Sequence, residues 1–145
     1  MENKVFKIAR TFNAKRQDVW LAITDKDLMK QWYFNLPEFK AEAGFTFEFT
    51  GGEEGGKQFL HRCVITEVVI EKKLTYTWCY VGYAGVSYVT FELFDEGENT
   101  RLELTHAGIE TFPADVAAFT YHNFEAGWNQ IINSSLKDFL EKNKS

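Results

Sequence analysis

Apolar and polar residues alternate along most of the first 106 residues, which is the period of half-buried β-strands. In the segment GFTFEFT, for example, Phe45, Phe47 and Phe49 alternate with threonine and glutamate. The pattern predicts six strands, over residues 5–12, 44–50, 57–70, 74–81, 86–94 and 100–106. Most connections between them are short, so we expect antiparallel neighbours without βαβ crossovers. In the third strand the apolar residues change parity near Ile65, which predicts a β-bulge there.

A helical period replaces this alternation twice between the first two strands. The first helix is predicted over residues 14–24 with Asn13 as its N-cap, and the second over residues 26–32 with Asp25 as its N-cap. Their inner faces are predicted to carry Val19, Trp20, Ile23, Leu28 and Trp32. We expect these two short helices to close one end of the sheet.

The longest amphipathic segment extends from Phe112 to Lys142, and Pro113 suits the first turn of a helix. Its predicted apolar face carries Phe124, Trp128, Ile131, Ile132, Ser135 and Phe139. One long helix must then cover the apolar face of a whole sheet. The patterns together predict an α+β fold in a single domain, residues 1–145.

Four segments carry a family resemblance: TFNAKRQDVWLAITDKDLMKQWY, EVVIEKKLTYTW, VTFELFDEGENTRLELTHAGI and GWNQIINSSLKDFLE. In this order they resemble the START-like (SRPBCC, birch-pollen-allergen-like) superfamily, in its branch of activator-of-heat-shock-ATPase homologues. The resemblance implies a helix-grip fold, a curved antiparallel sheet of six to seven strands around a long C-terminal helix with a hydrophobic cavity between them. The seventh strand would come from residues 35–42, which the sequence itself predicts as a loop.

The same resemblance implies a range of functions. Such proteins bind lipids, sterols, polyketides or hormones, a minority catalyse cyclisation or hydrolysis, and eukaryotic relatives stimulate a chaperone ATPase. We therefore expect a hydrophobic small molecule as ligand, with a chaperone as an alternative partner.

Aromatic side chains make up 17% of the chain, and such rings either fill a solid core or line an apolar cavity. Ten of them are predicted to point between the sheet and the C-terminal helix. With His106 they form the predicted ligand-binding set: Trp32, Phe34, Phe45, Phe47, Tyr76, Trp78, Phe91, Tyr121, Phe124 and Trp128. The leading hypothesis is a non-catalytic protein that binds a hydrophobic or amphipathic molecule. A packed core is the competing interpretation of the same residues.

Two further hypotheses belong to different functional classes. A cyclase-type or hydrolase-type enzyme would use His106 as a titrating group, with Tyr76 or Tyr121 as its partner. The favoured interpretation of His106, however, is a strand-end histidine hydrogen-bonded to the backbone. A protein-interaction module that stimulates a chaperone ATPase would use exposed surface instead.

Other chemistry has little support in the sequence. None of the three histidines stands at metal-ligand spacing from another histidine or a cysteine, so we expect no metal and no cofactor. The segment GGEEGGK (residues 51–57) has the letters of a phosphate-binding loop, but a strand follows it and Gln58 replaces the magnesium-binding hydroxyl. We expect a hairpin loop there. Cys63 and Cys79 are expected to be reduced and to sit diagonally on adjacent strands.

The net charge of −5 argues against nucleic acid as a partner, because phosphate binding needs a concentrated basic face. No apolar run approaches the roughly 20 residues of a membrane span, and the N-terminus lacks a signal-peptide pattern. We expect a cytoplasmic protein without stable membrane insertion. The sheet edges and the side chains of Tyr83 and Tyr88 leave a homodimer open.

Overall fold

The computed structural model describes residues 5–33, 36, 38–52, 57–113 and 115–142. They form a six-stranded antiparallel sheet in the order β1-β6-β5-β4-β3-β2. The strands are β1 (Phe6–Phe12), β2 (Thr46–Gly52), β3 (Gln58–Val69), β4 (Lys73–Tyr80), β5 (Ser87–Glu96) and β6 (Asn99–Ala107). The α-helices are α1 (Arg16–Thr24), α2 (Lys26–Met29), α3 (Tyr121–Gln130) and α4 (Lys137–Lys142). The predicted α+β helix-grip architecture is confirmed.

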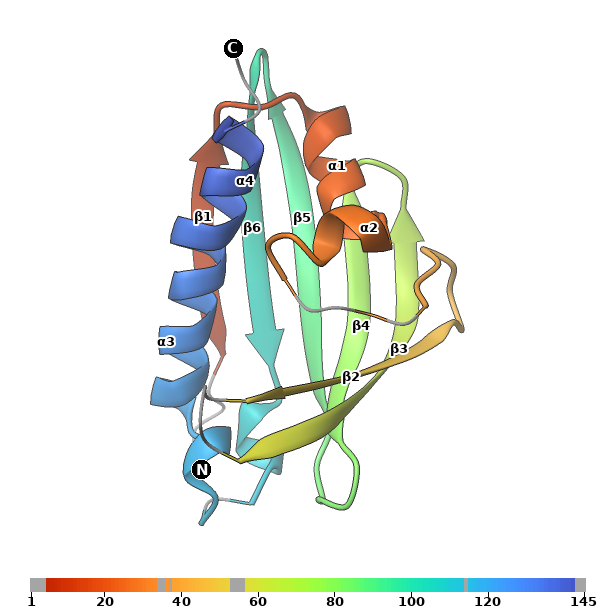
Figure 1. The fold of residues 1–145 in the computed structure, drawn as a ribbon, viewed down its shortest axis with the longest axis vertical. Helices are drawn as coiled ribbons and strands as arrows, with labels where there is room; N and C mark the ends of the chain where they lie inside the picture. The colour runs from red at the N-terminus through yellow and green to blue at the C-terminus, as the bar shows by residue number, and fades with distance from the viewer. Residues whose placement is uncertain (1–4, 34–35, 37, 53–56, 114, 143–145) are drawn as a thin grey trace.

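The sheet is strongly curved, and the helices lie on its concave side. Figure 1 shows β2 and the adjoining start of β3 crossing in front of the other strands toward α3. The helices α1 and α2 cover the other end of the concave side, while α3 and α4 run along the edge formed by β1. The register of β3 against β4 shifts between Ile65 and Glu67, which confirms the predicted bulge. A bulge bends its strand and increases the local twist, so it contributes to this curvature.

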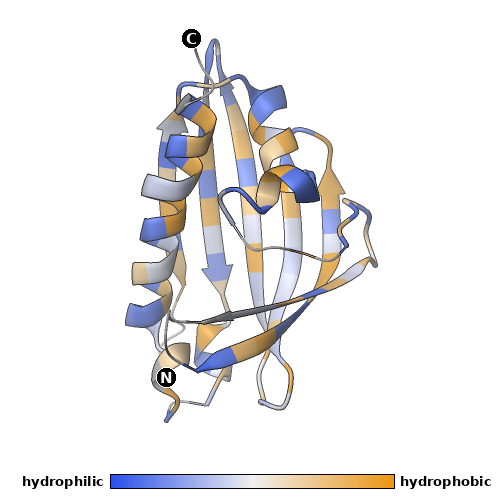
Figure 2. Cartoon of the chain, viewed as in Figure 1, coloured by the Kyte–Doolittle hydropathy of each residue, from blue (hydrophilic) through white to orange (hydrophobic). Residues whose placement is uncertain are grey.

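The core lies between the concave face and the helices. Along β4 the side chains of Leu74, Tyr76, Trp78 and Tyr80 are buried, and apolar and polar positions interleave in the same way along the other strands (Figure 2). Every second residue therefore contributes to the core, as a half-buried sheet requires. Of the segment 35–42, the described residues contain no strand.

The C-terminal helix begins at Tyr121, whereas the sequence predicted a start at Phe112. Thr120 is the N-cap, and its side-chain oxygen accepts a hydrogen bond from the backbone N–H of Asn123 at 3.3 Å. Short 3-10 turns at Ile109–Thr111 and Ala117–Phe119 precede it. Phe112 lies between these turns, with its ring centroid 5.2 Å from that of Tyr80, so core packing holds this segment outside the helix.

A π-helical segment, Ile131–Leu136, joins α3 to α4. The buried residues of the continuous helix follow a spacing of four: Phe124, Trp128, Ile132, Leu136 and Leu140. In a regular α-helix such a spacing drifts around the axis, but the wider π turn brings the later positions back to the core. The predicted inner positions Ile131, Ser135 and Phe139 are consequently only half-buried.

The two N-terminal helices differ from their predictions at the ends. The helix α1 begins at Arg16, and its N-cap residue is Lys15, which makes no side-chain cap. The predicted cap Asn13 lies two residues before Lys15. Asp25 caps α2 as predicted, since its carboxylate accepts hydrogen bonds from the backbone N–H groups of Asp27 and Leu28.

Helix α2 ends at Met29, so Trp32 lies in the turn that follows rather than on the helix. Its side chain is still buried. The indole Nε1–H donates to the carbonyl of Ala22 at 2.9 Å, so burial leaves this donor with a partner. That hydrogen bond anchors the connection between α2 and β2 on the concave side.

The two cysteines are free, but their relative position differs from the predicted diagonal. Cys79 is paired with Arg62, so it points to the opposite face of the sheet from Cys63. The turn between β3 and β4 is centred on Glu71, whereas the prediction centred it on Lys72. The bulge then shifts the pairing of the two strands by one further residue. Their side chains therefore cannot meet. Within the described residues, no helix combines the length and apolarity needed to cross a bilayer.

The two cap positions predict different stability effects. Asp25→Ala should lower the free energy of unfolding by about 1 kcal/mol, because two N–H groups of α2 lose their acceptor. Asn13→Ala is the matched control and should change it by less than about 0.5 kcal/mol. Urea unfolding followed by circular dichroism measures both, and equal losses would contradict these cap assignments.

Candidate functional site

A pocket of about 610 Å³ lies between α3, the end of β4 and the hairpin of β2 and β3. It is lined mainly by aromatic and small side chains, with few polar groups. The lining residues are Gly51, Lys57, Phe59, His61, Trp78, Tyr80, Val116, Ala118, Asn123, Phe124, Ala126, Gly127, Trp128 and Ile131. It is thus placed at the end of the concave side that α1 and α2 leave uncovered.

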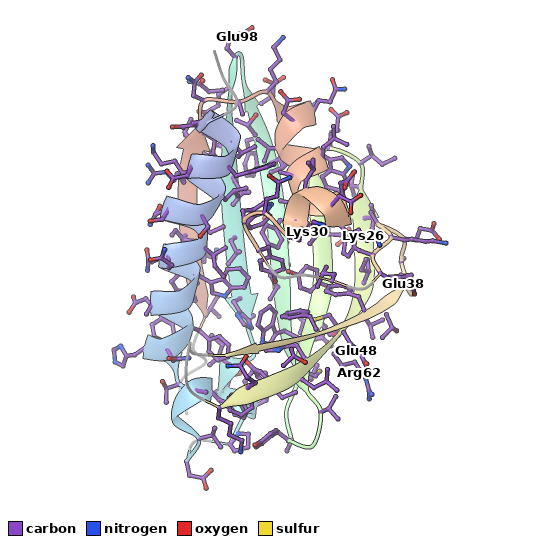
Figure 3. All side chains as sticks on the ribbon, viewed as in Figure 1. Lys26, Lys30, Glu38, Glu48, Arg62 and Glu98 are labelled. Atoms are coloured by element: carbon purple, nitrogen blue, oxygen red, sulfur yellow. The ribbon has the colours of Figure 1, made fainter. Side chains whose placement is uncertain are left out.

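The strand period explains why rings gather here. Phe59 and His61 share the inward parity of β3, and Trp78 and Tyr80 share that of β4. The outward face of the hairpin is polar instead, where Glu48 and Arg62 form an ion pair at 2.6 Å (Figure 3). From the other side, α3 contributes Phe124 and Trp128, which are one turn apart.

His61 is a neutral part of the pocket wall. Its Nδ1 lies 3.0 Å from the carbonyl oxygen of Phe59 and 3.3 Å from that of Phe49. Because carbonyls only accept, Nδ1 carries the hydrogen. Burial lowers the pKa of His61 from 6.5 to about 4, so the ring is uncharged at neutral pH.

Trp78 and Tyr80 pair with each other along β4. The indole Nε1–H of Trp78 donates to the hydroxyl oxygen of Tyr80 at 2.9 Å. Burial raises the pKa of the Tyr80 phenol, which therefore stays protonated. The two largest rings of the β4 wall thus bury their polar ends against one another.

A chain of buried hydrogen bonds connects α3 to the sheet. Trp128 Nε1–H donates to Nδ1 of His106 at 3.0 Å, and Nε2 of His106 lies 2.7 Å from the hydroxyl oxygen of Ser87. Ser87 in turn donates to the carbonyl of Trp78 at 2.9 Å. Since Nδ1 accepts, Nε2 carries the hydrogen and donates to Ser87. Each group in this chain then has a partner.

This geometry corrects the expected environment of His106. The sequence predicted a backbone partner, or Tyr76 or Tyr121 in an active site, but its partners are the side chains of Ser87 and Trp128. His106 and Ser87 are fully buried, and burial lowers the pKa of His106 to about 3. Although the pair resembles a Ser–His dyad, Nδ1 is occupied and the serine hydroxyl donates to a carbonyl. His106 therefore has no free lone pair with which to act as a general base.

Three of the predicted ligand-binding residues, Trp78, Phe124 and Trp128, line the pocket. Most of the others lie outside its lining. Trp32, Phe47, Tyr76, Phe91 and His106 are buried in the core, while Phe45 and Tyr121 are half-buried. Phe34 lies outside the described residues. Whether any of these residues binds a ligand stays a prediction.

The connection between α2 and β2 explains why most of the predicted residues lie outside the pocket. Tyr33 reaches into the concave space, where its hydroxyl lies 2.9 Å from that of Tyr76 and its ring stacks on Trp128 with centroids 6.3 Å apart. Phe39 follows, with its ring 5.1 Å from that of Phe47. These residues fill the middle of the concave side, and the pocket lies beyond them.

The sequence matches the family described as Activator of Hsp90 ATPase homolog 1-like protein over residues 13–141. The chain belongs to this family. The match confirms the resemblance, whose START-like fold is the one seen here. A comparison with curated proteins gives no match.

Solved structures with low sequence identity share the fold of this family member. The protein Mll3558 from Rhizobium loti has a TM-score of 0.80 at 21% identity, covering 96% of this chain and 98% of its own. BH1534 from Bacillus halodurans has a TM-score of 0.74 at 25% identity, covering 97% and 100%. DynU16, a protein of the dynemicin biosynthetic locus, has a TM-score of 0.78 at 20% identity, covering 99% of this chain but 49% of its own.

Several lining residues of this family member were missed from the sequence. Phe59, His61 and Tyr80 could have been found, because they continue the inward parity of Cys63 and Trp78. Lys57 has the same parity, but a charged residue at the start of a strand does not indicate an inward position, and Asn123 and Gly127 are not apolar helix positions. The path of the hairpin and of α3 brings these three residues together. Within the described ranges, no group of three metal-ligating side chains is present.

Two buried neutral histidines predict a loss of stability in mild acid. Their folded pKa values of about 4 and about 3 lie below the ordinary 6.5, so the unfolded state takes up protons first as the pH falls. The free energy of unfolding should therefore decrease below pH 6.5, by up to about 1.4 kcal/mol per pH unit for each histidine. Urea unfolding at a series of pH values measures the slope.

The matched variants separate this effect from general acid sensitivity. His106→Gln and His61→Gln should each flatten the slope, because each removes a buried imidazole whose folded pKa lies below the ordinary value. A slope that survives both buried-site substitutions would contradict the assignment.

Proposed function

We propose that this protein binds a small hydrophobic or amphipathic molecule in the pocket between α3 and the β2–β3 hairpin. The observation that carries the proposal is the pocket itself, whose volume of about 610 Å³ falls in the range of small-molecule sites. Its wall of aromatic rings with few polar groups is typical of sites for apolar ligands.

The hydrogen bonds of the wall support an apolar ligand body. The indole donors of Trp78 and Trp128 are both used within the protein, and so is Nδ1 of His61. A ligand that contacts these residues meets ring faces and edges rather than unpaired donors. Affinity would then come mainly from apolar surface removed from water, at about 25 cal/mol per Å² before ordering costs.

A glycine in the middle of α3 is a second support. Gly127 lines the pocket, and a Cβ added there would meet no atom within 4 Å in the described part of the chain. Glycine inside a helix costs about 1 kcal/mol relative to alanine. No packing contact requires it, so its absence of a side chain is consistent with space kept for a ligand.

One structural neighbour comes from a setting of small-molecule biosynthesis. DynU16, which shares the fold, belongs to a biosynthetic locus, and a small-molecule ligand for this chain is compatible with that setting. The enzyme alternative has less support, because His106, its predicted titrating group, is fully buried and hydrogen-bonded at both nitrogens.

Blocking the pocket should abolish binding of an uncharged aromatic probe. The probe is phenylnaphthylamine, whose fluorescence rises in apolar surroundings, titrated against the purified protein. Ala126→Phe places a ring in the pocket and should weaken binding at least about tenfold, which is about 1.4 kcal/mol. Gln17→Phe, an exposed position on α1 at the other end of the concave side and outside the lining, is the matched control and should bind as the wild type does. No saturable binding to the wild type, or equal loss in both variants, would refute the pocket as the site.

Gly127→Ala should stabilise the protein. The added methyl group enters open space and removes the helical penalty of glycine, so the free energy of unfolding should rise by about 0.5–1 kcal/mol. Gly97→Ala is the matched control, since Gly97 also has no atom near its missing Cβ but has a φ of +79°, which strains alanine. It should destabilise the protein in the same urea titration. A loss of stability in Gly127→Ala would show that the glycine has a structural role.

A further inference from the structure

Lys57 is the charged side chain at the pocket. It is exposed, and among the lining residues that the structure describes the remaining thirteen carry no charge at neutral pH. His61 is included in that count because burial lowers its pKa to about 4. Within its described lining, the pocket therefore presents an apolar interior with one positive charge at its exposed side.

The ammonium group of Lys57 is held in place although the residue is exposed. Its Nζ donates to the hydroxyl of Tyr83 at 2.9 Å. It also lies over the rings of Phe59 and Tyr83, 5.5 Å and 5.7 Å from their centroids. Such cation–π contacts restrain the side chain. An ammonium has three N–H groups, so two more can be donated to an anion without losing Tyr83.

The rings form a continuous path from this charge into the pocket. Phe59 lies beneath the ammonium, and the centroid of the Tyr80 ring is 5.7 Å from that of Phe59. Trp78 follows at 6.5 Å from Tyr80, and Trp128 at 5.6 Å from Trp78. A ligand with flat rings could contact this wall along its length with one end beside Lys57.

We propose that the pocket takes an anionic aromatic amphipath, with its rings against the wall formed by Phe59, Tyr80, Trp78 and Trp128 and its acid group bound by Lys57. This inference rests on the proposed function, which it narrows to one ligand class. A charge-assisted hydrogen bond from a restrained ammonium selects an acid over a neutral molecule of the same shape.

A pair of fluorescent probes with the same rings tests the charge separately from the pocket. Anilinonaphthalene sulfonate is anionic, and phenylnaphthylamine lacks the sulfonate. The wild type should bind the sulfonate more tightly than the neutral probe. Lys57→Met should weaken binding of the sulfonate about tenfold and change binding of the neutral probe several-fold less. Added salt should reduce the difference between the wild type and Lys57→Met.

Lys72→Met is the matched control. It changes the net charge equally, and Lys72 lies in the β3–β4 turn at the end of the sheet away from the start of α3 (Figure 1). It should bind both probes as the wild type does. Near-ultraviolet circular dichroism of each variant checks that the fold is intact.

The outcomes distinguish the two proposals. Suppose that the neutral probe binds the wild type. If Lys57→Met then weakens binding of both probes equally, or weakens binding of neither probe, the acid-binding role of Lys57 is overturned while the pocket stands. If the sulfonate loses as much affinity in Lys72→Met, a general effect of net charge replaces the specific contact. If neither probe binds the wild type saturably, the proposed function falls together with this inference.

Discussion

The buried hydrogen-bond chain from Trp128 through His106 and Ser87 to the carbonyl of Trp78 fixes the helix to the sheet. It crosses from α3 to β6, then to β5 and β4, in a region where the side chains of His106 and Ser87 are inaccessible to water. An unpaired polar group in such a place costs about 1–3 kcal/mol, so a sliding or rotated helix would lose several partners at once. Apolar packing alone would tolerate more positions of the helix.

The hydrogen bonds of the tryptophans also determine which parts of their side chains face the pocket. Because the indole of Trp128 donates to His106, and that of Trp78 donates to Tyr80, these residues present their rings to the pocket with their polar edges already satisfied. The neutral state of both buried histidines belongs to this arrangement, since protonation would place uncompensated charge beneath the rings. Among the described lining residues, the charged group, that of Lys57, lies at the exposed side.

Much of the fold could be predicted from the sequence, and the reasons are local. Strand alternation depends on each residue and its second neighbour, so the six strands and the bulge near Ile65 were predicted correctly. The cap at Asp25 was also predicted correctly, because a capping side chain binds N–H groups two and three residues ahead of it. The start of the C-terminal helix was wrong, because Phe112 and Phe119 pack on Tyr80 and hold the preceding segment in short turns. The inner face of that helix was partly wrong, since no composition cue marks the π-helical segment.

The candidate site was harder to predict, because the sequence identifies inward-facing rings but not the space between them. Tyr33 and Phe39 belong to a segment without periodicity, yet they occupy the centre of the concave side and leave Tyr76 and Phe47 in solid packing. The concave side is therefore divided between a filled end and an open end. Within the open end, the exposed lining positions Lys57, Ala126 and Gly127 can change with little effect on packing. The rings of Trp78 and Trp128 cannot, because they are buried and hydrogen-bonded within the core. Variation on such a scaffold should therefore concentrate at the rim of the pocket rather than at its aromatic wall.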